Sequence, residues 1–66
     1  MTAPSTYTAH VRARNREDAR DIARRRAWDD GYRTLAMRRV TNTTGAGADG
    51  LVGYAVELAV APRPVP

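Results

Sequence analysis

Residues 51–60 read LVGYAVELAV and alternate with the period of two that is typical of a β-strand. The larger apolar side chains share one face: Val52, Tyr54, Val56, Leu58 and Val60. The other face carries mainly small residues and one acid: Leu51, Gly53, Ala55, Glu57 and Ala59. This is the most apolar strand that the chain can form, and we expect it at the centre of a sheet.

Two further segments are predicted to be strands. Residues 7–13 alternate, with Tyr7, Ala9, Val11 and Ala13 on one face, which indicates a half-buried strand. Residues 32–41 are rich in β-branched and aromatic residues at their ends, although their alternation is imperfect. The segment 42–50, with its three glycines, is typical of a long hairpin loop that joins this strand to the last one.

A helix is expected from Arg16 to about Trp28. The Asn15 side chain is placed to cap it by accepting a hydrogen bond from the backbone N–H of Asp18, and Gly31 is a natural stop. At 100° per residue the apolar stripe contains little volume, because it consists of Ala19, Ile22, Ala23 and Ala27.

Arg26 also turns toward this apolar stripe. We expect its stem to cover apolar surface while the guanidinium reaches solvent, and a buried pair with Asp30 is the less favoured alternative.

The element order is therefore β-α-β-β, and the predicted fold class is α+β. If the last strand lies between the other two, the three-stranded sheet is wholly antiparallel in the order 1-3-2, with one helix packed on one face. A parallel pairing in the order 1-2-3 is less attractive in so small a sheet. We expect a flexible N-terminus at residues 1–6, a single domain at 7–60 and a Pro-rich tail at 61–66.

The element order, the chain length and the segment GLVGYAVELAV at residues 50–60 resemble the topology of dodecins, small flavin-storing proteins that assemble into hollow dodecamers. The helix expected here is several residues shorter than theirs. The Trp at the start of their second strand has no counterpart at residues 32–35, and the Gln of their last strand has none at residues 54–56. The resemblance implies the topology alone, and we expect no cofactor.

The composition is basic and lacks the usual stabilising devices of small domains. The chain has eleven arginines, no lysine and a formal net charge of +4, which favours anionic partners, although a GC-rich coding sequence is the preferred explanation for the arginines. Without cysteine there is no disulfide or thiolate metal site, and one histidine cannot form a metal cluster. No apolar run is long enough for a membrane span or a signal peptide, so we expect a cytoplasmic protein.

Small side chains surrounded by charges are predicted on the outer face of the sheet. That face is expected to include Thr8, His10 and Arg12, with Thr34, Ala36 and Arg38 joining them if Leu35 and Met37 point inward. Glu57 is then expected to pair with Arg12 and Arg38.

Trp28 has two interpretations. It either folds back to cap the core or forms an exposed anchor at a subunit interface, and Arg24 can stack on it in both cases.

Three functions follow as hypotheses, and none is enzymatic, because no nucleophile has a positioned base. The first is a homo-oligomeric interaction module whose interface contains His10, Arg12, Trp28, Ala55, Glu57 and Ala59. The second is a nucleic-acid-associated accessory protein that uses Arg20, Arg24, Arg25, Arg33, Arg38 and Arg39. The third is a small inhibitor or adaptor that covers another protein.

Overall fold

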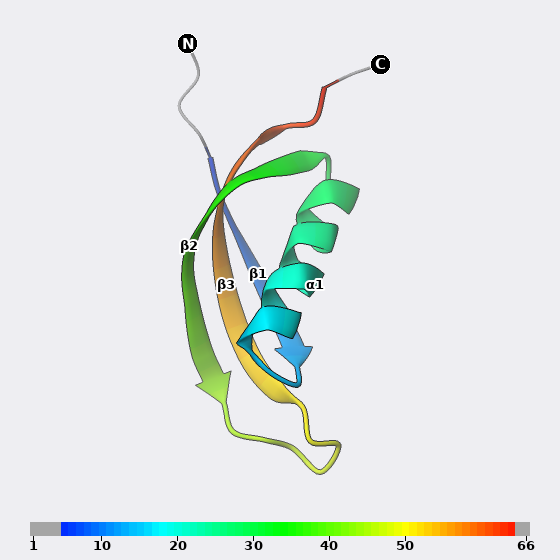
Figure 1. Ribbon diagram of the computed structural model, residues 1–66, viewed down its shortest axis with the longest axis vertical. Coiled ribbons are helices and arrows are strands. Elements are labelled where there is room, and N and C mark those ends of the chain that lie inside the picture. The colour runs from blue at the N-terminus through cyan, green and yellow to red at the C-terminus, as the bar shows by residue number, and fades with distance from the viewer. Residues whose placement is uncertain (1–4, 65–66) are drawn as a thin grey trace.

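The computed structural model describes residues 5–64, which form one helix and three strands (Figure 1). In chain order these are β1 (Ser5–Ala13), α1 (Arg16–Asp29), β2 (Tyr32–Thr44) and β3 (Val52–Pro62). The expected terminal segments lie partly outside this range, at residues 1–4 and 65–66. The strands are longer than predicted, since β1 begins at Ser5 and β3 continues to Pro62, opposite Tyr32.

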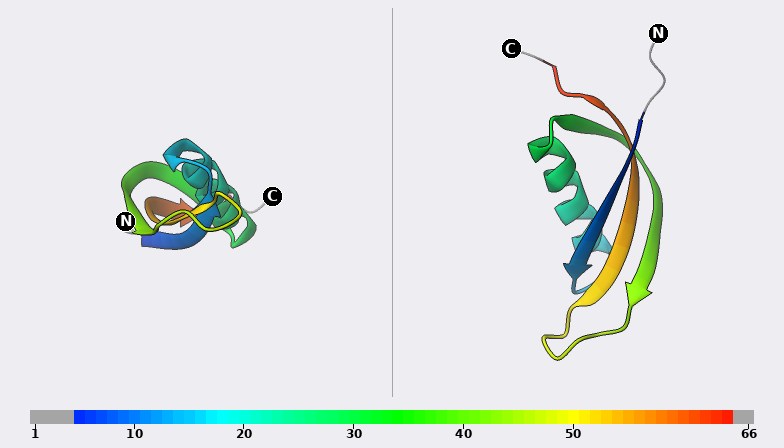
Figure 2. Two further views of the ribbon diagram at one scale, coloured as in Figure 1. Left: turned by 90° about the horizontal axis from the view of Figure 1, so that it is seen from below. Right: turned by 180° about the vertical axis from the view of Figure 1, so that it is seen from behind.

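The sheet has the order β1-β3-β2, and β3 is antiparallel to both neighbours, which confirms the predicted α+β fold. The helix lies on one face only, and the views from two sides agree on this (Figures 1 and 2). The alternation of residues 51–60 thus identified the central strand correctly, because a strand paired on both sides gains most from a continuous apolar face.

The core lies between α1 and the inner face of the sheet. Its largest fully buried side chains are Val56, Leu58 and Val60, all on β3. The helix meets them with Ala19, Ala23 and Ala27, which are completely buried, while Ile22 is half-buried at the margin. Alanine lets the helix approach the sheet closely but contributes little apolar area to the core.

Local signals set the bounds of the helix as predicted. Asn15 Oδ1 accepts a hydrogen bond of 2.8 Å from the backbone N–H of Asp18 at the N-cap. Gly31 adopts a φ of +97° just after the helix, a conformation that a residue with a Cβ reaches only at a cost. The N–H of Arg63 donates to the Gly31 carbonyl over 2.9 Å, so the segment after β3 returns to the end of the helix.

Three register shifts interrupt the pairing of β2 with β3 and correct the expected outer face. Thr34 is opposite Val60 and therefore lies on the inner face, and Leu35 is 46% exposed instead of pointing inward. Arg39, not Arg38, is opposite Glu57. A bulge inserts one unpaired residue and reverses the alternation beyond it, so a strict period of two cannot be followed through this strand.

Candidate functional site

Within residues 5–64, α1 covers one face of the sheet and leaves the outer face uncovered (Figures 1 and 2). Along its centre β3 presents Gly53, Ala55, Glu57, Ala59 and Ala61. Four of these five side chains are no larger than a methyl group. Ala59 is only 5% exposed although it faces outward, which means that the neighbouring strands close around it. Little side-chain volume therefore projects from the centre of this face.

Polar and charged side chains border this face on both sides. On β1, Thr8, His10 and Arg12 are opposite Glu57, Ala55 and Gly53, as the outer-face prediction required.

On β2, Ala36 is opposite Ala59, and Arg39 Nε lies 4.0 Å from Glu57 Oε2. The predicted pairing of Glu57 with Arg12 and Arg38 was wrong, because Arg12 Nη2 instead pairs with Asp49 Oδ1 at 3.1 Å.

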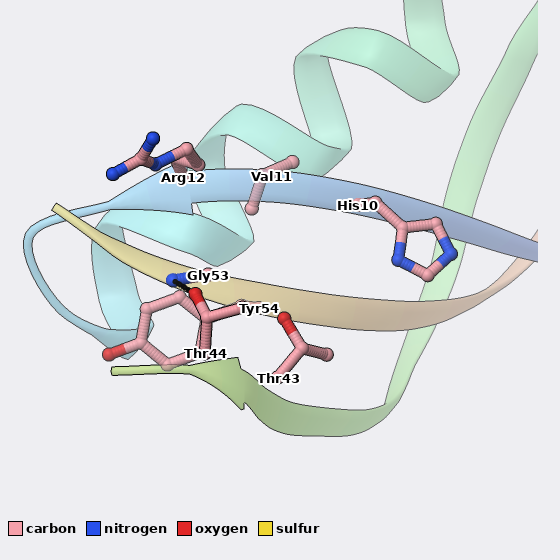
Figure 3. A pocket seen from close by; sticks show the side chains of 7 residues that line it. All are labelled: His10, Val11, Arg12, Thr43, Thr44, Gly53 and Tyr54. Carbon is pink, nitrogen blue, oxygen red and sulfur yellow. Dashed lines mark hydrogen bonds between the residues drawn. The ribbon is translucent and has the colours of Figure 1, made fainter. Parts of the chain in front are cut away.

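A pocket of about 330 Å³ opens at the end of the sheet next to the hairpin loop. Its wall includes His10 and Arg12 of β1, Thr43 and Thr44 of β2 and Gly53 of β3, together with Val11 and Tyr54 (Figure 3).

Gly53 lies between Arg12 and Thr44 in the register, and the hydroxyls of Thr43 and Thr44 occupy the space that a side chain at this position would need. Its N–H donates to Thr44 Oγ1 over 3.1 Å (Figure 3). A Cβ at Gly53 would lie 2.4 Å from Thr44 Oγ1 and 2.9 Å from Thr43 Oγ1. From the sequence we considered Gly53 only as one of the small residues of this face. A glycine within a central strand also indicates that another group approaches the backbone closely at that position.

Two arginines of α1 bind the main chain of the sheet's edge strands. Arg26 Nη1 donates to the His10 carbonyl of β1 over 2.8 Å, and Arg16 Nη1 donates to the Val40 carbonyl of β2 over 3.0 Å. The Arg26 guanidinium is thus exposed, as expected, but it is hydrogen-bonded. The alternative pairing with Asp30 was wrong, since Asp30 accepts a hydrogen bond from the Tyr7 hydroxyl.

The arginines proposed for nucleic-acid binding do not form one patch. Arg20, Arg24 and Arg25 lie on α1. Arg33 and Arg39 are opposite Ala61 and Glu57, on the face of the sheet away from the helix. Arg24 and Arg39 also have carboxylates at 3.8 Å and 4.0 Å.

Trp28 is 52% exposed, so the expectation that it caps the core was wrong. The Arg63 guanidinium carbon lies 5.0 Å from the centre of its ring, the stacking role that was expected of Arg24. Trp28 belongs to α1 and lies on the helix side of the molecule. The structure therefore does not bring it together with the other five predicted interface residues, which all lie on the outer face.

No protein-family model matches this chain, and neither a curated protein nor a solved structure has significant similarity to it. Within residues 5–64, the helix is too short and too polar to cross a bilayer.

Proposed function

We propose that the protein is a non-enzymatic module that associates with further copies of itself through the outer face of its sheet. The observation that carries this proposal is the line of small side chains along β3, on the face of the sheet that α1 does not cover. Two sheets pack face to face at about 10 Å, and small residues at the centre allow that approach without steric conflict.

The limited core supports self-association. The chain has 66 residues, and six of the eleven buried apolar residues within residues 5–64 are alanines. Domains below about 70–80 residues often gain stability from a disulfide, a metal or an oligomeric partner, and the sequence contains no cysteine. Burial of the outer face against a second copy would supply apolar area that the single chain lacks.

The protected edges favour the face over edge-to-edge pairing. Arg26 donates a hydrogen bond to a backbone carbonyl of β1, and Arg16 donates one to a backbone carbonyl of β2. The three register shifts also interrupt β2. Bulges and charged side chains at an edge are devices that prevent strand addition, so the outer face is the better site for a second copy.

The charges on the face suit a two-fold arrangement. Glu57 lies beside Arg39 on the same surface, and Thr8 lies on its other side. In a two-fold contact the same patch serves both subunits, so each acid can meet an arginine of the other copy.

The nucleic-acid hypothesis ranks second, because its six arginines are divided between α1 and β2. The adaptor hypothesis ranks third, since in the part of the chain that the structure describes Trp28 and Leu35 are the only large apolar residues that are exposed.

The test compares Ala36→Lys with Ala46→Lys by light scattering coupled to size exclusion at micromolar concentration. Ala36 is exposed on the outer face opposite Ala59, and Ala46 is exposed in the hairpin loop, so the same substitution is tolerable at both sites in the monomer. We expect a wild-type mass that is a multiple of 7.2 kDa, a mass near 7.2 kDa for Ala36→Lys and the wild-type mass for Ala46→Lys.

A folded wild-type monomer would overturn the proposal. Equal dissociation of both variants would show that added charge, and not the outer face, controls association. Binding of generic DNA or RNA by the wild type, lost steeply with salt, would favour the second hypothesis.

A further inference from the structure

We propose that the pocket at the hairpin end of the sheet binds a small oxyanion, such as a phosphate or a carboxylate group. This goes beyond self-association, because it assigns a ligand to a pocket at the hairpin end of β1, β2 and β3. The inference rests on the hydrogen-bond donors of the pocket, on its glycine and on the way the loop holds Arg12.

The polar side chains of the pocket are all able to donate. They are the Arg12 guanidinium, the His10 ring and the hydroxyls of Thr43, Thr44 and Tyr54. No lining residue is acidic. A guanidinium offers five N–H groups in a planar fork, and Arg12 uses one terminal nitrogen for Asp49, so the remaining groups can serve an oxyanion.

The hairpin loop holds Arg12 beside the pocket. Asp49 Oδ1 accepts from Arg12 Nη2 over 3.1 Å and also from the N–H of Leu51 over 3.0 Å. The Gly47 N–H donates to the Leu51 carbonyl over 3.0 Å, which closes the loop. A Cβ at Gly47 would lie 2.6 Å from Arg12 Nη2, so the glycine makes room for the guanidinium. A donor that is already oriented loses less entropy when it binds.

The pocket has the size for one anionic group and a few further atoms. Its volume of about 330 Å³ is at the lower end of the range for small-molecule sites. Gly53 lets the two threonine hydroxyls lie against the central strand, since a Cβ there would meet both of them. Because Thr44 Oγ1 accepts from the Gly53 N–H, its own proton remains free to donate to a ligand.

The test is a titration of the labelled protein with inorganic phosphate and, separately, with acetate, followed by ¹H–¹⁵N NMR at fixed pH and constant ionic strength. We expect saturable shifts confined to the pocket residues Arg12, Thr43, Thr44 and Gly53 and to the His10 ring. The tighter of the two anions identifies the class of oxyanion.

The matched charge variants are Arg12→Gln and Arg25→Gln. Arg25 is exposed on the helix, and the same net charge is lost at both positions. We expect Arg12→Gln to weaken binding by about tenfold or more, as for loss of a charge-assisted contact, and Arg25→Gln to leave it nearly unchanged. Equal weakening by both variants, or shifts that rise linearly and spread over the helix, would overturn the proposal.

Gly53→Ala is expected to abolish binding by displacing the threonines. Since that change also strains the strand, Thr43→Val provides the second variant, because it removes one hydroxyl with little change of volume. If Thr43→Val and Gly53→Ala, each tested as a single variant, both bind the oxyanion with wild-type affinity, the proposal is overturned.

The Ala36→Lys variant allows oxyanion binding to be tested independently of the proposed self-association. Ala36 is opposite Ala59, while the pocket surrounds Gly53 at the other end of β3. We expect the variant to bind the oxyanion even as a monomer, so the loss of self-association and the loss of the pocket are distinguishable outcomes.

Discussion

Tyr7 connects the first strand to the end of the helix. Its ring packs at 5.9 Å and 51° against Tyr32, and its hydroxyl donates to Asp30, the C-cap of α1. The hydrogen bond to Asp30 raises the pKa of Tyr7 above its usual value of 10.0, and partial burial raises this pKa further. Because the folded-state pKa is raised, the contribution to stability is fully present below pH 10.0 and is lost as the pH rises through the folded-state pKa.

We predict that Tyr7→Phe lowers the free energy of unfolding by about 1 kcal/mol at neutral pH, because the hydrogen bond to Asp30 is lost. The difference between the wild type and this variant should shrink as the pH rises well above 10.0. Urea unfolding at both pH values measures it. Tyr32→Phe is the control, since it keeps the Tyr7 hydroxyl and should retain the pH dependence. A difference that is equal at both pH values would contradict this account.

The helix protects the sheet as well as covering its inner face. Arg16 lies at the start of α1 and Arg26 near its end, and each donates to a carbonyl of a different edge strand. An arginine-rich helix therefore has a structural use here that does not depend on an anionic partner. Exposed strand edges recruit other chains, and long charged side chains across them oppose this.

Arg26→Ala is predicted to cost about 1 kcal/mol of stability and to increase aggregation, because the His10 carbonyl loses its donor. Arg25→Ala removes the same charge at the adjacent, exposed position and should change neither property. Chemical denaturation gives the stability, and light scattering during incubation gives the aggregation rate. Indistinguishable behaviour of the two variants would mean that the contact to β1 has no protective role.

At the scale of the whole molecule, the two faces are unlike each other. Trp28 and its Arg63 contact lie on the helix side, while the small residues of β3 lie on the opposite side. The segment after β3 is fixed to the helix end through the Arg63 N–H and the Gly31 carbonyl. The proposed self-association through the outer face would therefore leave Trp28 outside the contact.

We accordingly expect Trp28→Ala to leave the oligomeric mass unchanged in light scattering. Since the side chain is 52% exposed, its truncation should cost well below the roughly 3–5 kcal/mol of a buried aromatic, and the variant should remain folded. Circular dichroism with chemical denaturation measures the stability. A lower mass would place Trp28 in the interface, and an unfolded variant would restore the core interpretation.

The sequence alone was enough to predict the elements and their order, because the signals that determine them are local. The alternation of residues 51–60 predicted the central strand, and Asn15 and Gly31 predicted the bounds of the helix within one residue. The small side chains on the outer face of β3 could also be predicted from the alternation along this strand, because its pairing with β1 contains no bulge.

Only the tertiary structure decided which side chains meet. Because of the bulges in β2, Arg39 and not Arg38 lies opposite Glu57, and Thr34 lies on the inner face. Segments that are distant in sequence likewise determine the hydrogen bond from Arg26 to His10, the exposure of Trp28 and the pocket next to Gly53. A period of two or of 3.6 assigns a residue to a face, but register and bulges arise from pairing between strands, and local pattern carries no information on them.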